Sequence, residues 1–145
     1  MAATSQVSMS YPKPRDSQTK FVKILRTDTT AFQGAMLPRD AVITGLYVIG
    51  QAVCNASVGS GFINLGNTTT ANEYIASYDV CTTATGYGYN PAGAKADGAT
   101  LGERLTADTP IYAKFVEVST SSSSGGPWYV KIEYAVLSSG ETIQL

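Results

Sequence analysis

The chain has 145 residues with 43% hydrophobic and 14% charged side chains and a net charge of −1, a composition that indicates one domain with a sizeable core. It contains no run of 18 apolar residues that predicts a transmembrane helix, and no apolar segment near its start that predicts a secretory signal. It also contains no histidine, which excludes Ser-His-Asp and Cys-His catalysis and a histidine zinc site.

Charge is unevenly distributed along the chain. Residues 1–26 carry five basic side chains against Asp16 alone, whereas the rest of the chain carries five basic and ten acidic side chains. Residues 1–19 are small and polar, so we expect an extended N-terminal arm that becomes ordered against a partner or a neighbouring copy. Lys23 has a second interpretation, as an edge charge that discourages strand pairing. The candidate docking residues are the bases of this leading segment, Lys13, Arg15, Lys20, Lys23 and Arg26.

Residues 20–145 are predicted to form one all-β domain, a single β-sandwich of seven to eight short strands in a jelly-roll-like arrangement. A continuous apolar run at 41–53 indicates a central strand buried on both faces. Gly45 inside this run indicates a β-bulge or a close approach of another backbone. The shorter strands of the first half are expected at 20–27, 32–37 and 61–66.

One short helix is predicted at 70–79. Thr70 and Glu73 have the spacing of a capping box, and apolar residues follow them at roughly helical spacing. The helix would make two turns before the chain enters a glycine-rich segment.

That segment, 82–100, is predicted to be a long loop. Its Tyr87 and Tyr89 are flanked by glycines, so we expect them to contact another protein; a platform that stacks a sugar is the alternative. Four other tyrosines are expected to pack in or near the core: Tyr74, Tyr78, Tyr112 and Tyr134.

Two runs near the end of the chain, 110–119 and 128–137, alternate apolar and polar residues. Period-two alternation of β-branched and aromatic residues predicts strands with one buried face. The Ser/Gly/Pro linker at 120–127 predicts that the two strands form a hairpin with a long exposed loop. Residues 138–145 follow as a short tail.

The sequence predicts neither enzymatic activity nor a cofactor or metal. Cys54 and Cys81 cannot complete a thiolate zinc site, and two free thiols are expected because a single pair does not define a disulfide framework. The basic residues lack interleaved aromatics for stacking bases, so no nucleic-acid partner is expected. The carboxylates that could pair in a glycosidase lie at turns, loops or exposed strand positions, where a solvated acid is expected. They are Asp79, Asp97, Glu103, Asp108, Glu117 and Glu133.

Four segments, taken in order, resemble a known family. They are LPRDAVITGLYV (37–48), GNTTTANEYIASYDV (66–80), LTADTPIYA (105–113) and WYVKIEY (128–134). Over residues 37–137 the chain resembles small β-sandwich structural proteins of tailed bacteriophages, especially head decoration or cement proteins.

The resemblance implies a virion protein on the outer surface of the capsid, assembled in the host cytoplasm. Its partners would be the major capsid protein and further copies of itself, as a dimer or trimer, with no membrane, no cofactor and no active site. Such a protein bridges neighbouring capsid subunits, and many copies on a lattice add their contacts. Two other functions stay open from the residues alone. One is a receptor- or glycan-binding virion module, such as a head fibre or tail-tip adhesin, and the other is an enzyme, which the missing histidine disfavours.

Overall fold

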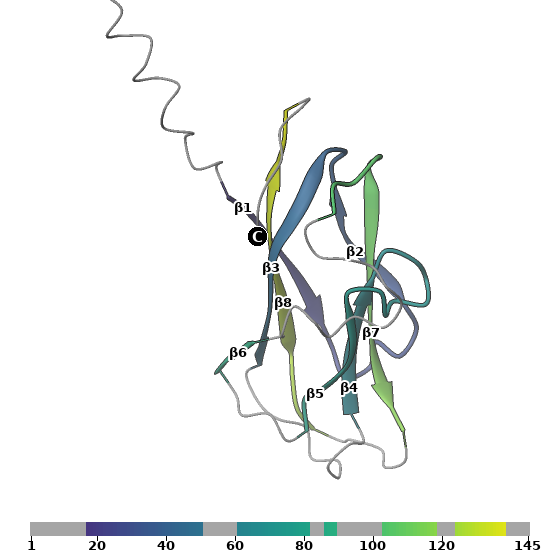
Figure 1. The fold of residues 1–145 in the computed structure, drawn as a ribbon. Coiled ribbons are helices and arrows are strands. Elements are labelled where there is room, and N and C mark those ends of the chain that lie inside the picture. Colours follow the sequence, from purple (N-terminus) through teal and green to yellow (C-terminus); the bar gives the residue numbers. More distant parts are fainter. Residues whose placement is uncertain (1–16, 51–60, 82–85, 90–102, 119–123, 139–145) are drawn as a thin grey trace, which may run out of the picture.

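The computed structural model describes residues 17–50, 61–81, 86–89, 103–118 and 124–138. Within these residues the chain forms eight β-strands and no helix, in two four-stranded antiparallel sheets. Sheet A has the order β1-β8-β3-β6 and sheet B the order β2-β7-β4-β5. In Figure 1 the strands of sheet A lie toward the left and those of sheet B toward the right. The strands are β1 (Gln18–Ile24), β2 (Phe32–Leu37), β3 (Ala41–Gly50), β4 (Gly61–Gly66), β5 (Ile75–Asp79), β6 (Gly86–Tyr89), β7 (Thr109–Glu117) and β8 (Trp128–Val136).

The strands pair in a nested order, so that the first half of the chain folds back on the second half. β1 pairs with β8, β2 with β7, β3 with β6 and β4 with β5. The contacts of β3 with β8 and of β4 with β7 then join these pairs into the two sheets. As a result, β1 and β6 are the edges of sheet A, and β2 and β5 are the edges of sheet B.

The inner faces of both sheets share one apolar core. The ring of Phe115 in β7 stacks on Trp128 in β8, with ring centroids 5.2 Å apart and an interplanar angle of 4°. Gly50 lies against the same indole, because a Cβ there would come within 2.8 Å of Trp128 Cδ1. Burying a large apolar side chain of this kind stabilises the fold by roughly 1.5–3 kcal/mol, so this stack ties one sheet to the other.

The two C-terminal runs are strands, but the predicted hairpin is wrong. β7 belongs to sheet B and β8 to sheet A, so the linker between them crosses from one sheet to the other. Both strands bury one face in the same core, from opposite sides. Such strands have the same alternation of residues whether or not they pair with each other.

The helix predicted at 70–79 is wrong. The end of this stretch is β5, which pairs with β4, and a turn precedes it. Ala71 and Ser77 have φ angles of 55° and 57°, which lie in the left-handed region and interrupt a right-handed helix. The capping-box spacing therefore occurs here in a turn between two strands.

The predicted loop at 82–100 contains a strand. Residues 86–89 form β6 and pair with the end of β3, so Tyr87 and Tyr89 lie at the edge of a sheet. β3 is the central strand expected, and it is buried on both faces at Ala41–Ile43; beyond this point its inner residues are buried, whereas Thr44 is exposed and Tyr47 and Ile49 are half-buried. The bulge expected at Gly45 is confirmed, because the register with β8 shifts between Ile43 and Gly45.

Cys81 is disulfide-bonded, so the expectation of two free thiols is wrong. The only other cysteine of the sequence is Cys54, which lies outside the described residues. Cys81 follows β5 and packs against the core. The spacing of two cysteines in a sequence does not tell which strands bring them together, and this is why the composition alone favoured free thiols.

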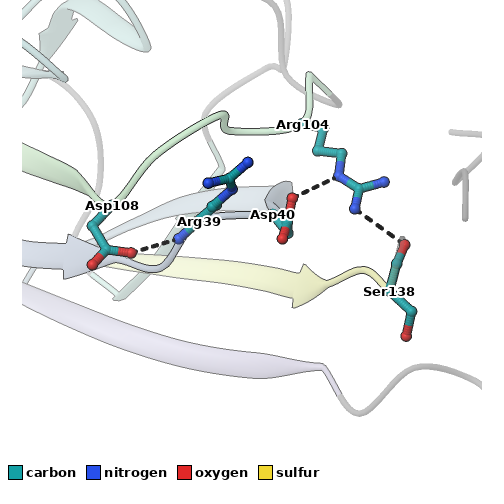
Figure 2. A network of polar contacts seen from close by, with 5 residues as sticks. All are labelled: Arg39, Asp40, Arg104, Asp108 and Ser138. Atoms are coloured by element: carbon teal, nitrogen blue, oxygen red, sulfur yellow. Dashed lines mark hydrogen bonds and ion pairs between the residues drawn. The ribbon is translucent and has the colours of Figure 1, made fainter. Parts of the chain in front are cut away.

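A polar network holds the end of the molecule where β3 begins (Figure 2). Arg104 Nε donates to Asp40 Oδ1 at 3.0 Å, and the same guanidinium donates to the backbone oxygen of Ser138 at 3.1 Å. Asp108 Oδ1 accepts from the backbone N–H of Arg39 at 2.8 Å. The network thus joins the segment before β7 to the turn before β3 and to the end of β8.

Candidate interaction surface

β1 exposes a regular strand edge. Its inward residues Val22 and Ile24 are buried, whereas the outward residues Phe21 and Lys23 are exposed, with 57% of Phe21 accessible. This alternation is what makes the segment a strand with one buried face. β1 pairs with β8 through all seven residues without a bulge, and in the described part of the chain no strand pairs with its other side.

The other three edge strands are irregular or short. β2 has a register shift between Gln33 and Ala35, and β6 has four residues. β5 has a register shift against β4 and a positive φ at Ser77. Bulges and short length discourage a strand from accepting a further partner. Among the described strands, β1 is therefore the edge best suited to pair with another chain.

The strand register brings three of the seven sequence-predicted interface residues, Lys23, Tyr87 and Tyr89, into two rows across sheet A. Lys23 belongs to β1 at one edge, and Tyr87 and Tyr89 belong to β6 at the other edge. The first row joins Phe21, Lys131, Tyr47 and Tyr89, and the second joins Lys23, Tyr129, Ile49 and Tyr87. We call the described side chains of these rows the outer face of sheet A: Phe21, Lys23, Tyr47, Ile49, Tyr129 and Lys131.

Lys131 occupies the middle of this face. Its Nζ lies 3.2 Å from Glu133 Oε2 and 5.2 Å from the centroid of the Tyr47 ring. Both charged side chains are partly exposed, so solvent screens the ion pair, which contributes about 0–1 kcal/mol. Lys131 Nζ thus contacts both a carboxylate and the face of the Tyr47 ring. The side chains of Lys20 and Lys23 on β1 have no hydrogen bond or ion pair with any described residue.

The predicted docking residues separate into three groups. Lys13 and Arg15 lie outside the described residues. Lys20 and Lys23 both belong to β1 but, three residues apart, lie on opposite faces of the strand. Arg26 follows the strand and lines a shallow hollow of about 250 Å³ beside the loop before β8. The structure therefore brings two of the five bases to one strand edge.

Sequence reasoning did not single out Tyr47, Tyr129 or Lys131. The available signal was the outward half of the alternation in β3 and β8, which is rich in tyrosine and poor in unpaired charge. Aromatic residues are enriched at protein interfaces, whereas lysine is depleted there, so the tyrosines and Phe21 are the residues of this face that favour a protein contact. The outer face of sheet A therefore has the composition of a protein-binding surface.

A second hollow lies at the end of the molecule near the polar network. It has a volume of about 270 Å³ and is lined in part by Ile43, Asn67, Tyr74 and Leu105. Burial raises the pKa of the Tyr74 hydroxyl, the hydrogen bond with Asn67 opposes this, and the negative charges of nearby carboxylates raise it further. Tyr74 therefore stays neutral, and its hydroxyl can form hydrogen bonds at the wall of the hollow.

Glu73 organises the turn beside this hollow. Burial raises the pKa of its carboxyl, but hydrogen bonds from the Thr68 hydroxyl and from backbone amides of the turn outweigh burial, so the pKa lies below its usual value of 4.5. The backbone N–H groups of Asn67 and Asn72 donate to Glu73 Oε2 at 3.1 and 3.2 Å. The carboxylate of Glu73 thus accepts hydrogen bonds that stabilise the turn.

Two general searches of the described residues complete the survey of sites. No three Cys, Asp or Glu side chains there gather closely enough to hold a metal ion. In the same part of the chain, no helix has the length and apolarity to cross a membrane.

Two solved structures share the fold of this chain. One is a chain of the capsid asymmetric unit of the cyanophage Pam1, with a TM-score of 0.61 and 18% identity, covering 94% of this chain and 100% of that chain. The other is a chain in the acidic stable capsid structure of Helicobacter pylori bacteriophage KHP30, with a TM-score of 0.51 and 11% identity, covering 83% of this chain and 93% of that chain. Both structures are of bacteriophage capsids. No protein-family model and no curated protein matches the sequence.

Proposed function

We propose that this chain is a virion structural protein, a decoration or cement protein that binds the outer surface of a phage head. In this role it bridges neighbouring subunits of the major capsid protein and associates with further copies of itself. It binds the shell through contacts that many copies repeat on the lattice, so each copy contributes modestly. It performs no catalysis and needs neither nucleic acid nor membrane.

The observation that carries this proposal is the fold likeness to the Pam1 capsid chain, because the alignment spans the whole of that chain. The outer face of sheet A supports it independently, since a half-buried surface of tyrosine, phenylalanine and lysine suits contact with another protein. The two unpartnered lysines on β1 favour an acidic partner surface.

We also propose that the fold is a jelly roll. The support is the nested pairing of the eight strands, β1 with β8 through β4 with β5, distributed over two sheets. A jelly roll consists of eight strands in two sheets connected as two Greek keys, and it is common in viral capsid proteins.

The role of the leading segment is tested by deletion. Removal of residues 1–16 leaves β1 complete, because the strand begins at Gln18. We expect the truncated protein to fold with the same thermal midpoint and to be depleted in purified particles, measured by quantitative mass spectrometry. The matched control is Lys114→Ala on the outer face of sheet B, which leaves occupancy unchanged. Full occupancy of the truncated protein would contradict docking through the arm.

Copy number tests the proposed function itself. A decoration protein is present in hundreds of copies per particle, and the same mass spectrometry measures this against the major capsid protein. A few copies per particle would contradict the cement role.

A receptor- or glycan-binding virion module is the second candidate. The observation in its favour is the gathering of Tyr47 and Tyr129 on one sheet face, since sugar rings stack on exposed aromatic rings. It predicts that purified protein binds host surface polysaccharide and that Tyr87→Ala with Tyr89→Ala abolishes this binding. Absence of binding by the unaltered protein removes this candidate.

A further inference from the structure

The regular edge of β1 needs an occupant of defined character. A partner strand must supply backbone hydrogen bonds along seven residues and an apolar side chain against Phe21. It must also supply negative charge on the outer face, because the exposed side chain of Lys23 has no partner among the described residues and no acid lies on β1. Charge therefore disfavours the pairing of β1 with the β1 of another copy.

The seven residues that follow Ser138 in the sequence have this character. They read Ser-Gly-Glu-Thr-Ile-Gln-Leu and lie outside the described residues. Glu141, Ile143 and Leu145 alternate with Thr142 and Gln144, and this period of two, with two β-branched residues, is typical of an edge strand. The segment carries one acid and no base.

An antiparallel register matches this segment to β1 residue by residue. With Glu141 opposite Lys23, Ile143 falls opposite Phe21 and the remaining positions pair in step. Residues directly opposite each other in an antiparallel pair lie on the same face of the sheet. The carboxylate would then meet the exposed lysine, and the isoleucine would cover the exposed phenylalanine.

We propose that residues 139–145 of one copy add as an antiparallel strand to β1 of a second copy. The proposal specifies the self-association that the proposed function includes, and it is independent of binding to a capsid. If two copies exchange segments reciprocally, a closed dimer results; if each copy donates to the next, a ring results.

A copy cannot supply this strand to itself in the antiparallel register that places Glu141 opposite Lys23. Lys23 pairs with Tyr129, and Ser138 lies nine residues further along the chain of β8, about 30 Å away at the rise of a strand. Hydrogen bonds from Arg104 to the oxygen of Ser138 and from Leu137 N to Asp40 O fix this departure point. Glu141 of the same copy follows Ser138 by three residues, which span roughly 10 Å at most. It therefore cannot reach Lys23 of its own chain.

Cysteine trapping on the full chain tests the proposal. The variant Phe21→Cys with Ile143→Cys is expected to form a covalent species of at least twice the 15.2 kDa chain mass on a non-reducing gel. The matched control is Met36→Cys with Ile143→Cys. Met36 is 42% exposed on β2, the edge of the other sheet, and should give no such species. Covalent species in equal yield from both variants, or trapping within one chain, would overturn the proposal.

Charge reversal provides a second measurement that leaves the fold intact. Lys23 is exposed, so Lys23→Glu is expected to keep the thermal midpoint and to weaken self-association, measured by sedimentation, on the order of tenfold. Glu141→Lys in the same chain should restore association. A purified chain that is monomeric at every concentration, or an association that Lys23→Glu and removal of 139–145 leave unchanged, would refute the strand exchange. Either result leaves the copy-number test of the proposed function unaffected.

Discussion

Gly34 lies where the edge strands of the two sheets approach each other. A Cβ at this position would lie 2.4 Å from Val22 Cγ1 and 3.3 Å from the Phe32 ring. Val22 is buried in β1 and cannot shift without disturbing sheet A. We therefore expect Gly34→Ala to lower the free energy of unfolding by about 1–3 kcal/mol, measured by urea denaturation. The neighbouring exposed substitution Gln33→Ala should change it by less than about 0.5 kcal/mol, and equal stability of the two variants would show that β2 does not pack against Val22.

Glu73 makes the stability of the protein depend on acid. Because the folded state depresses the pKa of this carboxyl below 4.5, its contribution is present above that value and is lost as the pH falls through the folded pKa. We expect Glu73→Gln to lower stability at neutral pH and to flatten the loss of stability below pH 4.5, as followed by the thermal midpoint between pH 3 and 7. Glu103→Gln, at an exposed position, is the control. Parallel pH profiles for the Glu73→Gln variant and the unaltered protein would contradict this role.

At the scale of the strands, the alternation of side chains predicts which residues are buried but not which strands pair. The buried set of Trp128, Val130 and Ile132 follows from the sequence of β8 alone. Its pairing with β1 and β3 does not, because the facing sheet presents the same alternation from the opposite side. Pairing depends on contacts between distant segments, and no local pattern encodes them.

The turn before β5 shows the same limit for local side-chain chemistry. Thr70 and Glu73 have capping-box spacing, and Glu73 does accept hydrogen bonds from backbone amides. The chain nevertheless continues as a strand, since Ile75 is buried against the core and β5 pairs with β4. The carboxylate satisfies the donors of a turn as well as those of a helix, so the spacing alone does not distinguish the two.

The candidate surface could be predicted in part. The sequence alone predicts the positive charge of Lys20 and Lys23 and, from its glycine context, a contact role for Tyr87 and Tyr89 that stays a prediction. Their placement on one sheet follows only from the register of β1, β8, β3 and β6. The same register places Lys131 of β8 between β1, which carries the lysines, and β3, which pairs with the tyrosines of β6.

Arg104 fastens the segment before β7 to the first residues of β3. Its ion pair with Asp40 is about one third exposed, so Arg104→Ala should lower global stability by less than about 1 kcal/mol. The local effect should be larger, because the backbone N–H of Leu105 donates to the Ala41 oxygen in the same clamp. We expect faster hydrogen exchange at Leu105 in this variant and unchanged exchange at Val130 in the core. Acceleration at both amides alike would indicate global unfolding and contradict a local clamp.

For the whole molecule, the disulfide at Cys81 is a covalent constraint on the fold. The sequence offers Cys54 as the only partner within the chain, which closes a loop of about 27 residues. Closing a loop of this length limits the unfolded ensemble and stabilises the fold by roughly 3–4 kcal/mol. We therefore expect thiol titration of the denatured, unreduced protein to find no free thiol.

Cys81→Ser should lower the thermal midpoint as much as Cys54→Ser with Cys81→Ser does, because either change removes the same bond. Two titratable thiols per chain, or a Cys81→Ser variant as stable as the unaltered protein, would show that the fold does not depend on this bond. The proposed place on a released particle is consistent with the bond, since oxidising surroundings preserve a disulfide.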